Sequence, residues 1–216
     1  MPVQTYRPRS MQQWWWLCWF VMMTGSEQTL ARTLLDGFQY ASQKEATAAW
    51  VGNNGSPQVR QGKEGLTLPC PFREEVVRFS WDRVGDWDFS IYSSLELDLT
   101  TAEPDRIRSL SIYLKSGEGW YVWNRPLERA GRQRLRLLKA DFQTEGTVLG
   151  WNRIDAIRIA AWRGESKDAT LVLHELVGVS DRILLVTGTL STRDSSAQSL
   201  AKRVTQRISR WLAEVD

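Results

Sequence analysis

Residues 94–99 read Ser-Leu-Glu-Leu-Asp-Leu, a strict alternation of polar and apolar side chains. Successive side chains of an extended strand point to opposite faces, so the leucines share one face and the polar residues share the other. This pattern is typical of a β-strand with one buried and one solvated face. The same alternation recurs in residues 109–115, 134–137, 157–162 and 170–176.

Turn-forming residues separate the alternating segments, as in Ser-Gly-Glu-Gly at 116–119 and Gly-Glu-Ser at 164–166. Because no helical periodicity lies between these short segments, they predict antiparallel rather than parallel pairing. The expected fold class is all-β, with an antiparallel jelly-roll β-sandwich over residues 32–179. Further strands are predicted, from a less regular pattern, at residues 34–40, 47–51, 66–68 and 76–81.

Residues 1–31 are predicted to be a secretory signal peptide. Arg7 and Arg9 precede an apolar run at residues 14–23, and the small residues that follow suit cleavage after Ala31. The run is about half as long as the roughly 20 apolar residues that cross a bilayer as a helix. A retained anchor is the alternative interpretation, but we expect no stable membrane span once the signal is cleaved.

Residues 180–216 have a different pattern from the sandwich. A continuous apolar run at 183–186 is typical of a strand buried on both faces of a parallel sheet. Apolar residues then recur at helical spacing between positions 197 and 215. We expect a C-terminal strand and amphipathic helix that look like the start of a truncated α/β domain. The alternative is that both elements dock on the sandwich and the chain is complete.

Charge balance and the scarcity of cysteine and histidine exclude two kinds of site. Lys and Arg number 28 and Asp and Glu 25, and the two signs alternate along the chain, so we expect no nucleic-acid partner. Cys18, Cys70 and the single histidine, His174, are too few for a Cys/His zinc site within one chain. His174 is assigned no role, and no cofactor is expected.

Several motifs along the predicted sandwich carry a resemblance to a known fold. They are Trp-Asp at 81–82, Asp-Phe-Ser-Ile-Tyr at 88–92, the strand and turn at 110–121, Gly146 to Ile159, and Ala-Trp-Arg-Gly at 161–164. This set resembles the galactose-binding-like jelly rolls of bacterial secreted proteins, including family 11-type carbohydrate-binding modules found N-terminal to glycoside-hydrolase-type domains. The resemblance covers most of residues 36–178. It implies a polysaccharide or oligosaccharide partner and a secreted, periplasmic or cell-surface location.

Aromatic residues near position 120 are the main candidates for sugar contact. Trp120 is expected in the core, while Tyr121 and Trp123 are expected to form an exposed surface that stacks on a sugar ring. The alternative is that these rings also fill the core. Asn124 and Arg125 follow directly and could supply polar contacts. With the end of another predicted strand added, the candidate ligand-binding residues are Tyr121, Trp123, Asn124, Arg125, Trp162 and Arg163.

Several acidic residues are candidates for metal ligands or catalytic groups. Asp82, Asp86 and Asp88 could contribute to a structural Ca²⁺ site, although turn capping and solvated charge are the preferred interpretation. Glycosidases use paired carboxylates, but nothing in the sequence near Glu74 and Glu75 marks either as a proton donor. No catalytic residue and no bound metal are therefore assigned. A glycoside hydrolase domain downstream remains a hypothesis.

The sequence thus predicts a non-catalytic carbohydrate-binding-like module of an exported bacterial protein, attached to a glycoside-hydrolase-type activity. We expect a monomer. Two alternatives from other classes are a structural accessory jelly roll with no ligand and a cell-surface module for protein interactions.

Overall fold

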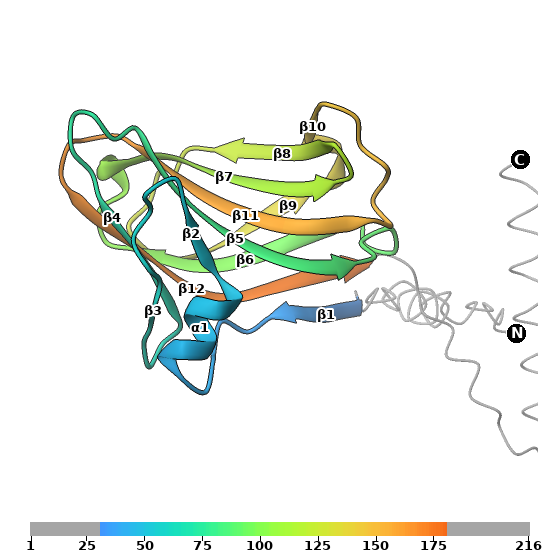
Figure 1. Ribbon diagram of the computed structural model, residues 1–216, viewed down its shortest axis with the longest axis horizontal. Coiled ribbons are helices and arrows are strands. Elements are labelled where there is room, and N and C mark those ends of the chain that lie inside the picture. Colours follow the sequence, from blue (N-terminus) through green and yellow to red (C-terminus); the bar gives the residue numbers. More distant parts are fainter. Residues whose placement is uncertain (1–30, 181–216) are drawn as a thin grey trace, which may run out of the picture. The chain divides into compact units, whose positions relative to one another are not determined.

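The computed structural model describes residues 31–180, which form a sandwich of two β-sheets (Figure 1). Of the predicted signal peptide, the described part includes Ala31, which starts the first strand. Residues 1–30 and the strand and helix predicted after residue 180 lie outside the described residues. Within residues 31–180, no helix has the length and apolar character needed to cross a membrane.

One layer is a six-stranded sheet, named here the β12 sheet. Its strand order is β3, β4, β12, β6, β9, and β1 also pairs with β12; every pairing is antiparallel. The strands are β1 (Ala31–Asp36), β3 (Arg60–Gln61), β4 (Leu66–Pro71), β6 (Ser94–Thr101), β9 (Gly131–Leu138) and β12 (Asp168–Ser180).

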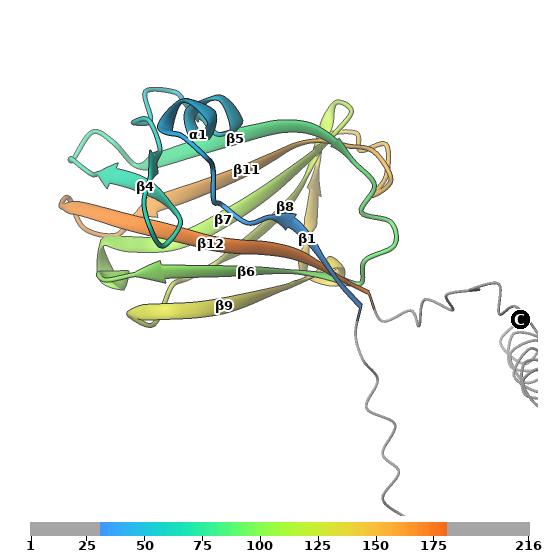
Figure 2. The same cartoon turned by 90° about the horizontal axis from the view of Figure 1, so that it is seen from below.

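The second layer, named here the β11 sheet, also has six antiparallel strands, in the order β10, β8, β7, β11, β5, β2. Figure 2 shows the two layers edge on, with β12, β6 and β9 in one and β5, β11 and β7 in the other. The strands are β2 (Val51–Asn53), β5 (Arg78–Trp87), β7 (Ile107–Ser116), β8 (Gly119–Arg125), β10 (Gln143–Glu145) and β11 (Ile154–Arg163). Two 3₁₀ turns, Pro104–Arg106 and Lys139–Asp141, and the helix α1 (Gln43–Ala49) complete the described fold.

The apolar residues of the alternating segments meet between the two sheets. Leu97 and Leu99 of β6 are 0% exposed, and Ile157 and Ile159 of β11 are 1% exposed. Burial of such a side chain stabilises the fold by about 1.5–3 kcal/mol, so the alternation supplies the main driving force for pairing the layers. The prediction of an all-β antiparallel sandwich is confirmed.

The strand predicted at residues 47–51 is wrong over most of its length, because α1 occupies residues 43–49 and β2 begins only at Val51. Ser42 caps the helix, since its hydroxyl accepts a hydrogen bond from the Glu45 backbone N–H at 3.2 Å. The Glu45 carboxylate in turn accepts from the Ala41 N–H at 3.2 Å. These local bonds satisfy donors that a helix N-terminus leaves open, and the alanine-rich sequence that follows favours a helix.

A buried carboxylate, Asp36, joins the end of β1 to the α1 region and to β5. Asp36 is 7% exposed. Its Oδ2 accepts hydrogen bonds from the Tyr40 hydroxyl at 2.7 Å, from Trp50 Nε1 at 3.0 Å and from Arg83, and its Oδ1 accepts from the Phe38 N–H at 2.8 Å. Burial, together with this carboxylate, raises the pKa of Tyr40 well above its usual range. The segment that precedes β2 is therefore held by one charged group.

We expect Asp36→Asn to destabilise the domain by about 3 kcal/mol, because removing one partner of a buried ion pair leaves the other charge uncompensated. The free energy of unfolding, measured by urea denaturation with tryptophan fluorescence, checks this. Asp86→Asn, at an exposed position of β5, is the control and should change stability by less than about 0.5 kcal/mol. Equal effects of the two substitutions would contradict the role given to Asp36.

Cys70 on β4 is 0% exposed, and burial raises the pKa of its thiol to about 12. The thiolate is the form that reacts with disulfide reagents, and little of it exists at neutral pH with such a pKa. In the full chain carrying Cys18→Ser, we expect no reaction of native Cys70 with Ellman's reagent at pH 8 and full reaction in denaturant. Rapid labelling of the native protein would show that β4 opens readily.

Candidate functional site

The side chains of the β11 sheet that point away from the core form a polar and aromatic surface. The cross-strand register shows which residues belong to this surface, because directly paired residues share a face. Arg158 of β11, for example, pairs with Tyr113 of β7 and with Asp82 of β5. We call this surface the outer face, and its polar and aromatic residues include Arg78, Asp82, Ser109, Ser111, Tyr113, Lys115, Trp120, Asn124, Glu145, Arg158 and Trp162.

At one end of the outer face, Trp162 is the centre of a hydrogen-bonded group. Its Nε1 donates to the Ser111 hydroxyl at 2.8 Å, and the Asn124 amide donates to the same hydroxyl and to that of Ser109. The guanidinium carbon of Arg78 lies 5.1 Å from the centroid of the Trp162 ring, within range of a cation–π contact. The ring is half-buried, so part of it faces solvent among groups that can bond to hydroxyls.

Toward the other end, Trp120 is surrounded by a second group of outer-face residues. The Arg158 guanidinium lies 4.7 Å from its ring centroid, and the Tyr113 ring meets it edge on at 6.1 Å. Arg158 makes a two-point contact with Asp82, at 2.6 Å and 2.8 Å, and Asn53 of β2 donates to the same carboxylate at 3.3 Å. The hydrogen bonds that Arg158 donates to Asp82 raise the pKa of Arg158, although burial opposes this shift. These contacts hold the Arg158 and Asp82 side chains in one geometry.

A pocket of about 570 Å³ lies beside this second group, at the edge of the sheet where β2 meets β5. Its walls combine the exposed apolar side chains of Val51 and Val84, which are 55% and 82% exposed, with polar groups of Asn53 and Asp82. Because Asp82 belongs to both, the pocket adjoins the outer face. The lining residues are Ala48, Ala49, Val51, Gly52, Asn53, Asp82, Arg83 and Val84.

The chain was compared with known protein families, with curated proteins and with solved structures. No known family matches it, and no curated protein matches it. Among solved structures, it superimposes on an agarase with a TM-score of 0.51 and 12% sequence identity, covering 68% of this chain and 24% of the agarase. The matched part of the agarase is thus a minor share of that enzyme. The domain has a jelly-roll fold.

Carbohydrate-binding modules are also among the structures similar to this jelly roll. A family 11 carbohydrate-binding module from Clostridium thermocellum, solved with a β-1,3-1,4-mixed-linked tetrasaccharide, gives a TM-score of 0.44 at 14% identity, covering 68% of this chain and 94% of that one. A family 27 module that recognises mannan gives 0.46 at 15% identity, covering 71% and 99%. The jelly-roll fold expected from the sequence is confirmed by the two antiparallel sheets and by the match to the agarase.

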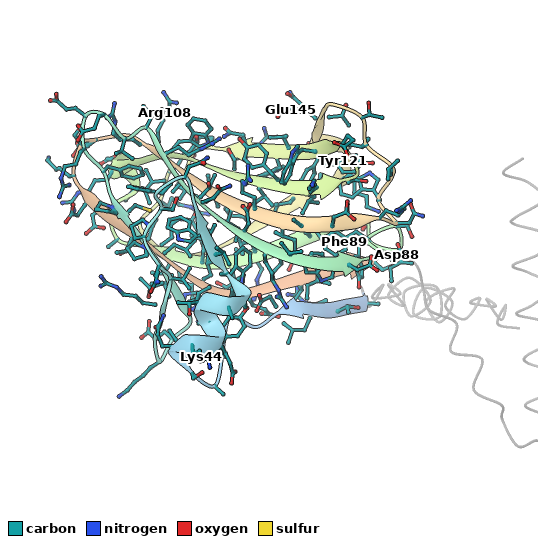
Figure 3. The ribbon with its side chains drawn as sticks, in the orientation of Figure 1. Lys44, Asp88, Phe89, Arg108, Tyr121 and Glu145 are labelled. Carbon is teal, nitrogen blue, oxygen red and sulfur yellow. The ribbon has the colours of Figure 1, made fainter. Side chains whose placement is uncertain are left out.

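The expected exposure of Tyr121 and Trp123 is wrong, because the jelly roll buries both rings. They are 7% and 3% exposed and project from β8 into the core. Tyr121, labelled in Figure 3, stacks on Trp151 with ring centroids 4.1 Å apart, and burial raises the pKa of its hydroxyl. Trp120 has the opposite parity and so lies on the outer face, not in the core where it was expected.

Arg125 and Arg163, the two predicted arginines, make contacts outside the outer face. Arg125 forms an ion pair with Asp141 at 3.4 Å and lies near the ring of buried Trp123. Arg163 donates hydrogen bonds to the backbone carbonyls of Arg73 and Glu74. Both side chains therefore fasten the ends of strands to neighbouring loops.

Of the six predicted ligand residues, the jelly roll brings Asn124 and Trp162 together, since both donate to Ser111. The outer-face residues that sequence reasoning did not select include Tyr113, Arg158 and Asp82. A signal for their face existed, because Arg158 shares its parity with Trp162 and opposes the isoleucines of β11. On β8, the polar residue Asn124 indicates which side chains point to the outer face. Trp120 lies four positions earlier and therefore points to the same face.

The acidic residues considered for Ca²⁺ have other roles where their contacts are described. The Asp82 carboxylate accepts hydrogen bonds from Arg158, and Asp88 accepts from the Ser90 N–H at 2.8 Å. Hydrogen bonds from the Ser90 hydroxyl and then from its N–H lower the pKa of Asp88. Figure 3 labels Asp88 just beyond the end of β5. Within residues 31–180, no three His, Cys, Asp or Glu side chains gather in a way that could hold a metal ion.

Replacing a core tryptophan should destabilise the domain more than replacing an outer-face tryptophan. We expect Trp123→Ala to lower the free energy of unfolding by about 3–5 kcal/mol, because it leaves a cavity in the core. Trp162→Ala, at a half-buried position, should cost about 1–2 kcal/mol. Chemical denaturation of each variant followed by circular dichroism measures both values. A larger loss for Trp162→Ala would place that ring in the core.

Proposed function

We propose that this domain is a non-catalytic module that binds a carbohydrate through the outer face of the β11 sheet. The observation that carries the proposal is the placement of two half-buried tryptophans, Trp120 and Trp162, on one sheet face among hydroxyl, amide and guanidinium groups. Aromatic rings contact the apolar faces of sugars, and nearby polar groups bond to the hydroxyls. A sheet face whose side chains only contact water does not require partly exposed tryptophan rings.

The distance between the two tryptophan groups suits an extended sugar chain. Trp162 lies at the C-terminal end of β11, whereas Trp120 is aligned through Lys115 with Ala156, near the start of that strand. Six residues of strand span about 20 Å at about 3.3 Å per residue. Several linked sugars would fit along the face, with the pocket beside Asp82 next to the Trp120 group.

Each tryptophan group offers a different set of polar contacts. Near Trp162, the Asn124 amide and the hydroxyl of Ser109 can donate or accept hydrogen bonds. Near Trp120, the Asp82 carboxylate is an acceptor that Arg158 already orients. Such pre-positioned groups reduce the entropy lost on binding, so the ligand need not order them itself.

Export and attachment to a glycoside-hydrolase-type activity belong to the same proposal. The basic residues and apolar run within residues 1–31 support export from a bacterial cell, as a secreted, periplasmic or cell-surface protein. The agarase with a similar jelly roll is an enzyme in which the matched part is 24% of the chain, which supports an accessory role beside another domain. The catalytic step would then reside elsewhere.

Affinity electrophoresis of the full chain against plant, algal and bacterial polysaccharides tests the proposal, with calorimetry on any that retard it. We expect dissociation constants in the micromolar to millimolar range, and Trp162→Ala or Trp120→Ala should weaken binding about tenfold or more. Trp87→Phe, at a half-buried ring of β5 that packs near Phe89, is the control and should bind like the unmodified protein.

Circular dichroism must show that each variant retains its fold. If no polysaccharide binds to the folded protein, the domain is a structural accessory without a glycan ligand. If binding survives both alanine substitutions, the outer face is not the binding site.

A further inference from the structure

Arg78, at the Trp162 end of the outer face, is a half-buried cation without a counter-charge. Among residues 31–180 it forms no ion pair and no hydrogen bond, and its one recorded contact is with the Trp162 ring. The other half-buried arginines among these residues have polar partners: Arg83 pairs with Asp36, Arg106 with Glu103 and Arg158 with Asp82, and Arg163 donates to backbone carbonyls. The free guanidinium is therefore a distinctive feature of this end of the face.

The surroundings of Arg78 leave its charge available to a ligand. The register places two carboxylates on the outer face, and one of them, that of Asp82, is already held by Arg158 through two hydrogen bonds. Glu145, on the edge strand β10 (Figure 3), is aligned with Trp120 at the opposite end of the face. By strand geometry that end is about 20 Å from Arg78, beyond the distance at which an exposed charge is felt strongly at physiological salt.

Stacking on Trp162 prepares Arg78 for binding an anion. A guanidinium is planar, is always charged and presents parallel N–H donors that match a carboxylate or a sulfate. Contact with the ring limits the positions of the guanidinium, so less freedom is lost when an anion binds. The same ring and the Asn124 amide remain beside it to contact a sugar.

We propose that the carbohydrate bound by this domain is acidic, and that its carboxylate or sulfate group binds Arg78 while an adjoining sugar ring contacts Trp162. This inference rests on the proposed function and specifies its ligand class. Lys115 adds a second cation on the same face, directly opposite Trp120 in the register and without an ion pair among residues 31–180. The charges of the outer face that have no ion pair among the described residues are Arg78 and Lys115 against Glu145, a positive balance that suits an acidic chain.

The test measures binding of the full chain to acidic and neutral polysaccharides at low and high salt. Polygalacturonate and alginate carry uronate groups, κ-carrageenan carries sulfate, and agarose and mixed-linkage β-glucan are neutral. We expect at least one acidic polysaccharide to bind about tenfold more tightly than the neutral ones, with affinity falling as salt rises from about 20 to about 200 mM. Which acidic polysaccharides bind separates a uronate from a sulfate ligand.

Arg78→Gln is the diagnostic variant, because it removes the charge and keeps much of the side-chain length. It should weaken acidic binding about tenfold and reduce its salt dependence, while any neutral binding changes by less than about twofold. Arg136→Gln, an exposed position on β9 of the opposite layer, is the matched control and should bind like the unmodified protein. Arg78→Lys should recover part of the affinity, since the charge returns without the two-point geometry.

The outcomes separate this inference from the proposed function. Equal affinity for neutral and acidic polysaccharides, or an equal loss with Arg78→Gln for both classes, would overturn the acidic ligand but leave carbohydrate binding in place. Absence of binding to every polysaccharide would remove the proposed function itself. The melting temperature of Arg78→Gln should equal that of the unmodified protein, which would show that any loss of binding is not caused by unfolding.

Discussion

The alternation of side chains along β11 is the constraint on which both the core and the candidate site depend. Ile157 and Ile159 must be buried to join the two sheets, and this requirement turns Arg158 and Trp162 outward. Antiparallel pairing then extends the same division to β5 and β7. A shift of one residue would send the arginine into the core and the isoleucines into water, so the register is strongly specified.

Much of the fold could be predicted from local sequence, because most strands bury one face. The alternation at 94–99 and 157–162 marked the strands and their buried parity correctly. β8 was harder, since its Gly-Trp-Tyr-Val-Trp-Asn-Arg sequence places aromatic rings on both parities. Hydrophobicity therefore does not show which face of β8 is buried. The polar residue Asn124 is the local feature that identifies the solvated face.

The remainder of the site depends on contacts between distant segments. Arg158 and Asp82 are 76 positions apart, and they meet because β5 and β11 pair in one particular register. Side-chain identities alone do not reveal that pairing. The strand predicted at residues 47–51 was wrong for a different reason. Ser42 and Glu45 form a capping pattern that is a local signal for a helix, and the strand prediction overlooked it. The Asp36 contacts that anchor this region are again non-local.

The pairing of Ala31 with Ser180 brings the two ends of the described domain side by side. Opposing forces applied at these residues would load the β1–β12 pair from one end, so its hydrogen bonds would break one after another rather than together. Peeling would proceed along the six residues of β1 until it reached the buried carboxylate at Asp36. β1 would therefore act as a short extensible segment under tension. The β11 sheet lies in the other layer, so this peeling would not break its strand pairings.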